Sequence, residues 1–501
     1  MRMAVAKGSD FFGTLQKQNI HLPAACGGKG KCGKCKVHLV SGTIPVTETE
    51  KRFLTEQELA DGIRLACCHK NCEEDVIIEV AEEPGAAGIL GTEQEQYAVT
   101  QQEDGLGIAV DLGTTTLAMA VIDLQDGRCL HEVRVMNPQR IYGADVISRI
   151  QACREHGVSV LQRMVLQEVG RSIEWALSTG RRILRMVVCG NSTMEHIFLG
   201  IDPWRIGEAP YVCEFEEMQT AESRELFAEW TGTMPSFPVI VLPNIAAFVG
   251  GDVVAGMISA GLDQRDSVLL IDLGTNGEMA LSHNGVIHTT STAAGPAFEG
   301  GNMVCGVASI PGAICRIQID EEEVQYQMLG TSSGSVGYGG NAGIRPIGIC
   351  GSGYIEGISE ILNQGWMDET GYLEQEVEIE GEIRIVPADI RNFQMAKSAV
   401  RSGINILCRQ AGVTFEEIRE VYISGGFGKS GNLAALARLK IIPREFLAKT
   451  QLLGNTALDG AVRVLLQDDR ERLHRMRMIS QNIDLARDPG FQEEYLKNMW
   501  F

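Results

Sequence analysis

The amino-acid sequence predicts a small α+β domain followed by a larger α/β domain that consists of two similar lobes. Six of the 14 cysteines lie between Cys26 and Cys72, which sets the N-terminal part apart from the rest. Residues 81–105 follow, rich in Glu, Gln, Gly and Ala as is typical of a linker. Beyond the linker, an Asp-Leu-Gly-Thr sequence occurs twice, at Asp111 and Asp272. The predicted limits are 1–82, 83–106, 107–264 and 265–501.

The composition indicates a globular protein, and we expect neither nucleic acids nor membranes among its partners. The chain has 501 residues, and 44% of them are hydrophobic, so cores can be buried. A net charge of -21 repels phosphate backbones, so we expect no nucleic-acid partner. We find no apolar run long enough to span a bilayer, and Met1–Ala6 is too short for a signal peptide. We therefore expect a cytoplasmic protein whose clustered cysteines bind metal.

The cysteine-rich part contains the pattern Cys26-x5-Cys32-x2-Cys35, and Cys67 follows 32 positions after Cys35. Three closely spaced thiols and one distant thiol are how ferredoxin-type domains hold a 2Fe-2S cluster. Glycines in the loop let backbone N–H groups approach the sulfurs. A zinc knuckle is the alternative reading, and one Cys-x2-Cys pair would suffice for it. The longer spacing and the glycines predict a 2Fe-2S cluster with Cys26, Cys32, Cys35 and Cys67 as ligands.

The fourth cluster ligand is left open between Cys67, Cys68 and Cys72. Cys67 is preferred because it follows the short apolar stretch Leu65-Ala66, whereas its neighbour Cys68 would point elsewhere. Twenty-five residues precede Cys26, which is short for a fold that normally begins with a pair of strands. We therefore expect the first strand to be shortened or missing, and the cluster to be exposed as a result.

The remainder alternates strand-like and helix-like segments, as in an α/β domain. Each Asp-Leu-Gly-Thr copy begins a predicted hairpin, because Asp126-Gly127 and Asn284-Gly285 favour the turns that join paired strands. Apolar residues at helical spacing predict helices at 145–154, 158–179, 194–199, 246–260, 353–364, 396–411 and 432–439. The two copies are about 160 residues apart along the chain, which predicts two similar lobes with a ligand between them.

The two Asp-Leu-Gly-Thr turns are candidates for binding metal and phosphate. An Asp at a strand end offers a carboxylate to a metal ion, and the following Gly and Thr residues offer N–H groups and hydroxyls to phosphate oxygens. A single copy is more readily explained as an ordinary hairpin turn. Two copies favour a nucleotide site made of Gly113, Thr114, Thr115 and Thr116 with Gly274, Thr275, Asn276 and Gly277.

A third glycine turn completes this set. The strand-like Val421–Ser424 leads into Gly425, Gly426, Phe427 and Gly428, where glycines let the backbone lie flat against an adenosine. Two phosphate loops and an adenosine loop in this order resemble the superfamily of sugar kinases, actin and heat-shock ATPases. In that chemistry the protein mainly positions Mg²⁺ and phosphates. We expect Asp111 and Asp272 to hold the water shell of Mg²⁺, and Glu278 to orient the attacking water.

Read end to end, the chain resembles the reductive activators of corrinoid proteins. The resemblance covers nearly the full length and rests on the cysteine pattern, on the Asp111 and Asp272 loops and on further motifs: Asn137–Asp145, Gly190–His196, Ala294–Gly300, Ser424–Gly428 and Asp484–Phe491. It implies a ferredoxin-like β-grasp domain joined to a two-lobed ATPase core of the actin, hexokinase and acetate kinase type, with a ribonuclease H-like fold.

The resemblance also implies a function and partners. Such activators use ATP and a 2Fe-2S cluster to return the Co(II) corrinoid of a methyltransferase protein to Co(I). It implies a corrinoid protein as partner, a low-potential electron donor and, in some members, a homodimer. Neither the identity of the corrinoid protein nor the step that ATP drives follows from the sequence.

Three other functions are compatible with parts of the sequence. An activator of radical dehydratases or ring reductases combines this ATPase fold with iron and sulfur, but its cluster cysteines lie within the ATPase domain. A ferredoxin scaffold with decayed ATPase lobes would not need Asp111 and Asp272. A sugar or acetate kinase would need a pocket for a phosphoryl acceptor, which the sequence does not identify.

Overall fold

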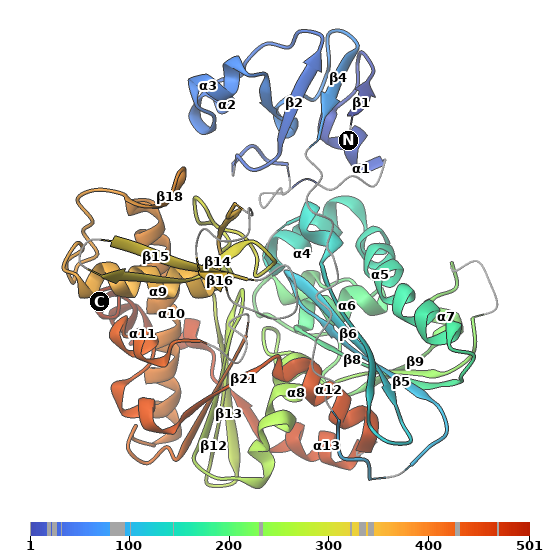
Figure 1. Cartoon of the computed structure of the whole chain (residues 1–501). Helices are drawn as coiled ribbons and strands as arrows, with labels where there is room; N and C mark the ends of the chain where they lie inside the picture. The colour runs from blue at the N-terminus through green and yellow to red at the C-terminus, as the bar shows by residue number, and fades with distance from the viewer. Residues whose placement is uncertain are drawn as a thin grey trace.

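The structure is a computed structural model with three parts that follow one another along the chain (Figure 1). An N-terminal domain lies above two larger lobes, and the first lobe and the second lobe lie side by side beneath it. The residues described are 2–17, 22, 28–31, 33–80, 96–100, 102–143, 145–229, 234–320, 323–329, 337–338, 345–425, 431–467 and 470–501.

The N-terminal domain is a four-stranded antiparallel sheet with short helices, in the strand order β1-β4-β2-β3. Its elements are β1 (Arg2–Val5), α1 (Phe11–Lys17), β2 (Lys36–Ser41), α2 (Glu48–Phe53), α3 (Glu56–Ala60), β3 (Ile63–Leu65), the 3-10 helix η1 (Ala66–Cys68) and β4 (Val76–Glu79). A single strand precedes α1 in place of a strand pair. The expectation of a shortened start is therefore confirmed.

Local sequence explains the two helices between β2 and β3. Thr47 and Thr55 each cap a helix, and each forms a capping box with the Glu three residues later, Glu50 and Glu58. The apolar residues of the domain form one core, in which Val5, Phe11, Leu15, Leu65 and Ile78 are almost fully buried. Cys35, at the end of the cysteine loop (residues 26–35), is part of this core.

The first lobe is built on a six-stranded sheet in the order β7-β6-β5-β8-β10-β9. Strands β5, β6 and β7 are antiparallel neighbours, and β8 and β10 continue the sheet in parallel with β5. Its elements are β5 (Leu106–Leu112), β6 (Thr116–Asp123), β7 (Cys129–Met136), η2 (Pro138–Ile141), α4 (Val146–His156), α5 (Val158–Ser178), β8 (Ile183–Gly190), α6 (Ser192–Leu199), η3 (Trp204–Ile206), β9 (Gln219–Glu222), α7 (Ser223–Leu226), β10 (Pro238–Val241), α8 (Gly251–Ala260) and η4 (Leu262–Gln264).

The second lobe repeats this arrangement with the sheet order β21-β20-β11-β12-β13-β22. Its elements are β11 (Val268–Leu273), β12 (Gly277–His283), β13 (Val286–Thr292), η5 (Pro296–Glu299), β14 (Ala313–Asp320), β15 (Glu323–Met328), β16 (Gly337–Tyr338), β17 (Gly348–Ile349), α9 (Gly351–Asn363), β18 (Val377–Glu380), β19 (Ile383–Ile385), α10 (Pro387–Ala411), β20 (Glu420–Gly425), α11 (Leu433–Arg438), η7 (Arg444–Lys449), β21 (Thr450–Gly454), α12 (Thr456–Gln467), α13 (Arg470–Ile479), β22 (Ser480–Asn482), η8 (Leu485–Arg487) and α14 (Phe491–Lys497).

The two predicted hairpins are confirmed as β5-β6-β7 and β11-β12-β13, each joined in parallel to a later strand, β8 or β20. Asn284 and Gly285 both have positive φ, as the predicted primed turn requires. Two predicted helix starts are wrong. The helix expected from residue 246 begins at Gly251, because residues 246–249 form a turn closed by a bridge between Ala246 and Val249. The helix expected from residue 396 begins earlier, at Pro387, a favourable first helical residue.

The lobes share a core made by α8 and α12. These helices approach so closely that a Cβ atom at Gly460 would lie 1.9 Å from the carbonyl oxygen of Ala255. Helix α12 also reaches the sheet of the first lobe, where the Arg185 side chain donates to the Leu465 carbonyl at 2.8 Å. Within the residues described, no helix has the length and apolar character needed to cross a membrane.

Candidate functional site

Two of the four predicted cluster ligands are described, and they lie together. Cys35 immediately precedes β2 and Cys67 lies in η1, yet their Sγ atoms are 3.2 Å apart. The Ala66 amide donates to the Cys35 carbonyl at 2.9 Å, which holds the two segments in register. Cys26 and Cys32 lie outside the described residues. A pair of buried thiols at this separation is a suitable half of a two-iron site, in which thiolates share a metal ion.

The exposure of the cluster stays a prediction, but the two predicted ligand thiols that are described are buried. Cys35 is 1% exposed and Cys67 is 7% exposed, because both pack into the core of the N-terminal domain. Burial excludes water from the thiols, and exclusion of water is one of the factors that set a cluster's potential.

The loop glycines adopt conformations that suit a cluster site. Gly28, Gly30 and Gly33 have φ values of +76°, +70° and +66°, a region that side chains rarely adopt. A Cβ atom at Gly33 would also lie 2.8 Å from the Phe53 side chain. Glycine is therefore required both for the turn and for the close packing of the loop.

A buried hydrogen bond between Glu50 and His69, which was not predicted from the sequence, supports the Cys67 segment. Glu50 is fully buried, and its Oε1 lies 2.8 Å from His69 Nε2 and accepts from the Leu65 amide at 2.8 Å. Burial by itself raises the pKa of Glu50, but the hydrogen bonds from His69, Thr47 and Leu65 lower it to about 2. The carboxylate thus binds the Leu65 backbone on one side of Cys67 and the His69 side chain on the other.

The two rival ligands have thiols that resist ionisation. Burial and the neighbouring Cys67 raise the pKa of Cys68 to about 11, and burial followed by the charge of Asp10 raises the pKa of Cys72. In the described part of the chain, no group of three or more ligand side chains is preassembled. The contact with Cys35 favours Cys67 over both alternatives.

The two predicted metal-binding carboxylates occupy equivalent places at the ends of β5 and β11. Burial raises the pKa of Asp111 to about 6, opposed by the Asn455 hydrogen bond and reinforced by the charges of Asp272 and Glu299. Burial likewise raises the pKa of Asp272 to about 6. Each carboxylate is only partly exposed to solvent. The duplicated sequence therefore places two acidic groups within reach of each other's charge.

Three more carboxyl groups join them. Burial, followed by repulsion from Asp111 and Asp272, raises the pKa of Asp252 to about 7. Burial and the charges of Asp252 and Asp272 raise the pKa of Glu278, which is paired opposite Asp272 in the sheet. Burial also raises the pKa of Glu299. A hydrated Mg²⁺ ion fits such a donor set, because oxygen ligands and retained waters suit this ion and its charge relieves the repulsion.

The two predicted phosphate loops touch each other. The Thr115 and Thr275 hydroxyl oxygens are 3.1 Å apart, and both donate to Glu299 Oε2, at 2.9 Å and 2.7 Å. Gly113 and Gly277 lack room for a side chain: a Cβ atom would lie 2.3 Å from the Thr116 carbonyl or 3.0 Å from Val400. These hydroxyls and the compact turns are suited to phosphate oxygens.

The remaining predicted loop residues have local roles in this structure. The Thr114 hydroxyl accepts from Asn191 Nδ2 at 2.9 Å and is buried, so it faces the first lobe. Thr116 begins β6. The Gly274 amide donates to the Asn276 carbonyl at 3.1 Å, which closes the second turn.

Only the first residue of the predicted adenosine loop is described. Gly425 ends β20 with φ +120°, and a Cβ atom there would lie 2.4 Å from the Leu273 carbonyl oxygen. This close approach brings the end of β20 against the strand that carries Asp272. Gly426, Phe427 and Gly428 lie outside the described residues.

Several residues of the site were not predicted from the sequence. Arg149 of α4 is fully buried beneath the first phosphate loop and donates to the carbonyl of Thr114. Asn455 precedes α12, caps it through Leu458, and donates to Asp111 Oδ2 at 2.8 Å. The sequence could have indicated Asp252, because it follows Gly250-Gly251 at the start of a helix. Asn455 and Arg149 show no comparable signal.

Comparison with known proteins agrees with this division of the chain. A model of the 2Fe-2S iron-sulfur cluster binding domain matches residues 11–72, the RACo middle region matches 106–265, and the C-terminal domain of RACo, described as the ASKHA domain, matches 266–501. The protein is therefore an iron-sulfur domain fused to an ATPase core of the actin and hexokinase type.

Relatives and a solved structure specify the family. The chain is 27% identical over 431 residues to the corrinoid activation enzyme RamQ of Eubacterium limosum, covering 79% of this chain and 70% of that protein. It is 27% identical over 389 residues to a Co(II) methylated amine-specific corrinoid protein reductase of Methanosarcina barkeri, covering 73% and 70%. A solved reductive activator for a corrinoid, iron-sulfur protein aligns with TM-score 0.69 and 26% identity, over 100% of this chain and 96% of that one. The chain belongs to the reductive activators of corrinoid proteins.

Proposed function

We propose that this protein uses ATP to deliver a low-potential electron from a 2Fe-2S cluster to the Co(II) corrinoid of a partner protein, which restores Co(I). One observation carries the proposal: a single chain combines the buried thiol pair, with Sγ atoms 3.2 Å apart, and two facing phosphate loops, with hydroxyls 3.1 Å apart. An electron carrier and an energy source are what an uphill electron transfer needs. The names of the relatives supply the kind of acceptor.

The cluster would be held by Cys26, Cys32, Cys35 and Cys67. When bound, a 2Fe-2S cluster supplies one-electron chemistry at a potential that its surroundings tune. Cys35 and Cys67 exclude water from their end of the site because both are buried. Glu50 holds the backbone of the Cys67 segment, which keeps the thiol oriented.

ATP would lie between the lobes, with its phosphates on the Gly113–Thr116 and Gly274–Gly277 turns and its adenosine against Gly425–Gly428. Asp111 and Asp272 would bind the waters of Mg²⁺, and Glu278 would orient the attacking water, since it is paired opposite Asp272. Asn455 keeps Asp111 in place from the second lobe. ATP would promote the reaction by favouring one arrangement of the lobes over another.

Four features remain predictions attached to this function. They are a low-potential electron donor, a homodimer, a location in the cytoplasm, and the domain limits 1–82, 83–106, 107–264 and 265–501.

The test is made on anaerobically purified protein with a chemical reductant and a Co(II) corrinoid protein. The visible spectrum is followed for Co(I) with and without Mg-ATP. Formation of Co(I) that requires ATP, and that is lost in Cys67→Ser but retained in the matched Cys72→Ser, supports the proposal. ATP turnover with an intact cluster but no Co(I) from a panel of corrinoid proteins contradicts it.

A further inference from the structure

Glu299 joins the two predicted phosphate loops. One carboxylate oxygen accepts hydrogen bonds from Thr115 of the first lobe and from Thr275 of the second lobe, at 2.9 Å and 2.7 Å. Phosphate oxygens are anionic acceptors of the same kind and use the same hydroxyl donors. A bound nucleotide phosphate and Glu299 therefore compete for these two hydroxyls.

Glu299 cannot move alone, because the chain around it is tightly packed. Gly300 has φ +80°, and a Cβ atom there would lie 2.4 Å from the Val307 carbonyl oxygen. Just before Glu299, the Phe298 carbonyl lies so close to α9 that a Cβ atom at Gly351 would be 1.7 Å from it. In such close packing a displacement of Glu299 is passed on to its neighbours. We call Glu299 and the five residues after it, 299–304, the coupling segment.

The far end of the coupling segment lies beneath the N-terminal domain. The Val304 amide donates to Asp389 Oδ1 of α10 at 2.7 Å, and Asn392 donates to the Asn302 carbonyl at 2.8 Å. Lys34, in the cysteine loop, donates to the Met303 carbonyl at 3.5 Å. The same short segment therefore contacts the predicted phosphate loops at one end. At the other end it contacts the cysteine loop (residues 26–35), which is called the cluster loop below.

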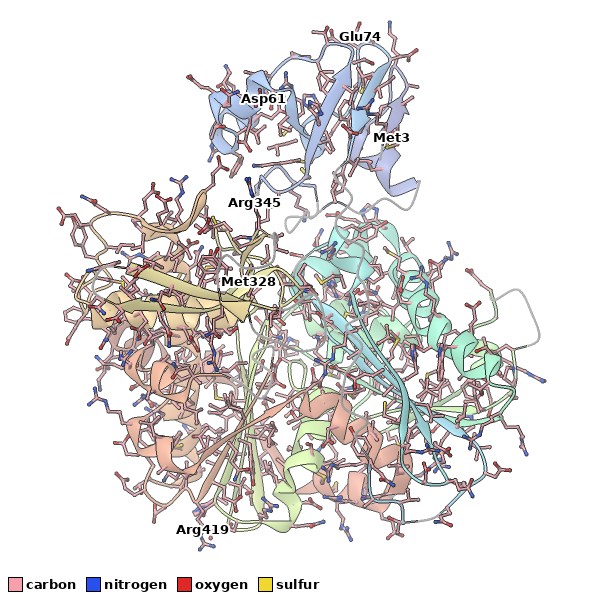
Figure 2. All side chains as sticks on the ribbon, in the orientation of Figure 1. Met3, Asp61, Glu74, Met328, Arg345 and Arg419 are labelled. Atoms are coloured by element: carbon pink, nitrogen blue, oxygen red, sulfur yellow. The ribbon has the colours of Figure 1, made fainter. Side chains whose placement is uncertain are left out.

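Charge interactions connect the cluster loop with both lobes. The positive charge of Lys34 opposes the effect of burial on the pKa of Asp389 in the second lobe. The charge of Lys29 adds to the Gln151 hydrogen bond in lowering the pKa of Glu155 on α4 of the first lobe. In Figure 2, the acidic residue Glu74 lies at the opposite end of the N-terminal domain, away from the lobes. Lys29 and Lys34 of the cysteine loop thus lie on the side of the N-terminal domain that faces the lobes.

We propose that Glu299 couples nucleotide binding to the contact between the cluster loop and the second lobe. A nucleotide phosphate takes the Thr115 and Thr275 hydroxyls from Glu299, the coupling segment shifts, and the contact of Lys34 with the second lobe loosens. The cluster loop becomes accessible to a partner when nucleotide is bound. This inference rests on the proposed ATP site and adds the residue through which ATP would act on the electron-carrying domain.

The test uses the full-length, cluster-loaded protein and a non-hydrolysable ATP analogue with Mg²⁺. Hydrogen exchange of residues 299–304 and 28–36 is measured together with the rate of iron loss to a chelator, and analogue binding is measured separately by calorimetry. We expect the analogue to increase both exchange and iron loss in the unmodified protein, by about fivefold or more, the lower range of typical coupling between sites. Glu299→Ala is expected to show fast exchange and iron loss without the analogue.

The outcomes separate the coupling from the proposed function. Binding of the analogue without any change at the cluster loop overturns the coupling and leaves the proposed function in place. No binding of the analogue overturns both. A full response in Glu299→Ala and in the milder Glu299→Gln, with the analogue bound, also overturns the role of Glu299.

A matched pair of lysine variants tests the other end of the segment. Lys34→Gln removes the charge that faces the second lobe, whereas Lys36→Gln removes an equal charge whose Nζ pairs with Glu58 Oε1 within the N-terminal domain at 2.5 Å. We expect Lys34→Gln to raise iron loss severalfold in the absence of nucleotide and Lys36→Gln to leave it near the unmodified rate. Equal rates in the two variants would contradict the docking of the cluster loop.

Discussion

The two Asp-Leu-Gly-Thr loops share a sequence and a place in their sheets, but their surroundings differ. The first loop is braced by its own lobe, through Arg149 beneath the Thr114 carbonyl and Asn191 at the Thr114 hydroxyl. The second loop has an additional acid, Glu278, opposite Asp272 in the next strand. The first loop therefore has contacts within its own lobe that hold it, whereas the second has one more carboxyl group beside its aspartate. Four predictions test this difference, from the largest expected effect to the smallest.

Substitution of the two strand-end carboxylates should affect ATP turnover unequally. Asp272→Asn is expected to lower kcat by about 10³-fold, because it removes the carboxylate charge that would hold the waters of Mg²⁺ next to Glu278. Asp111→Asn should cost less, since Asn455 can still donate to the remaining amide oxygen. Steady-state ATPase assays with Mg-ATP decide the order. A larger loss for Asp111→Asn would show that the first loop carries the chemistry.

Glu278→Gln tests whether the second loop supplies a group that orients water. We expect kcat to fall by about 10²-fold while the affinity for Mg-ATP changes little, as for loss of a general base. Turnover and nucleotide binding are measured on the same preparation. A weakened affinity with unchanged kcat would instead indicate that Glu278 only shapes the site.

Arg149→Met tests the bracing of the first loop. Its removal leaves the buried Thr114 carbonyl without a donor, so the free energy of unfolding should fall by about 2–4 kcal/mol. Arg154→Met is the control on the same helix, because Arg154 lies over the Trp204 ring near the surface. Denaturant unfolding of both variants measures the difference. Similar losses in the two variants would argue against a bracing role for Arg149.

The carboxylate cluster between the loops should make stability depend on pH. Folded pKa values of about 6 for Asp111 and Asp272 and about 7 for Asp252 lie above the ordinary value of 3.8. The folded state therefore binds more protons, so the stability contributed by these groups is present below about pH 4 and is lost as pH rises to about 7. We expect Tm to fall by a few degrees between pH 5 and pH 8, and Mg²⁺ to reduce the slope. A slope unchanged in Asp252→Asn would contradict the assignment.

Much of the fold follows from local patterns in the sequence. The strand alternation and the Asn284-Gly285 turn act within a few residues, so the hairpins were predictable in kind. The Thr47 and Thr55 caps are equally local, but the helices that they begin were not among those predicted. Helix starts were less predictable: residues 246–249 are apolar enough for a helix, but they turn back on themselves before α8. Burial of Cys35 and Cys67 was not predicted, because the core that covers them is assembled from the whole domain.

The sequence by itself determined the cysteine pattern, the duplicated hairpins and the positions of Asp111 and Asp272, because spacing and periodicity encode them directly. Only the tertiary structure decided which distant side chains complete the site. Asn455 reaches Asp111 across 344 positions of the chain, and Glu299 joins Thr115 and Thr275 across the two lobes. Such contacts carry no local pattern, because they form only when separate lobes pack together and bring their buried polar groups within hydrogen-bond distance.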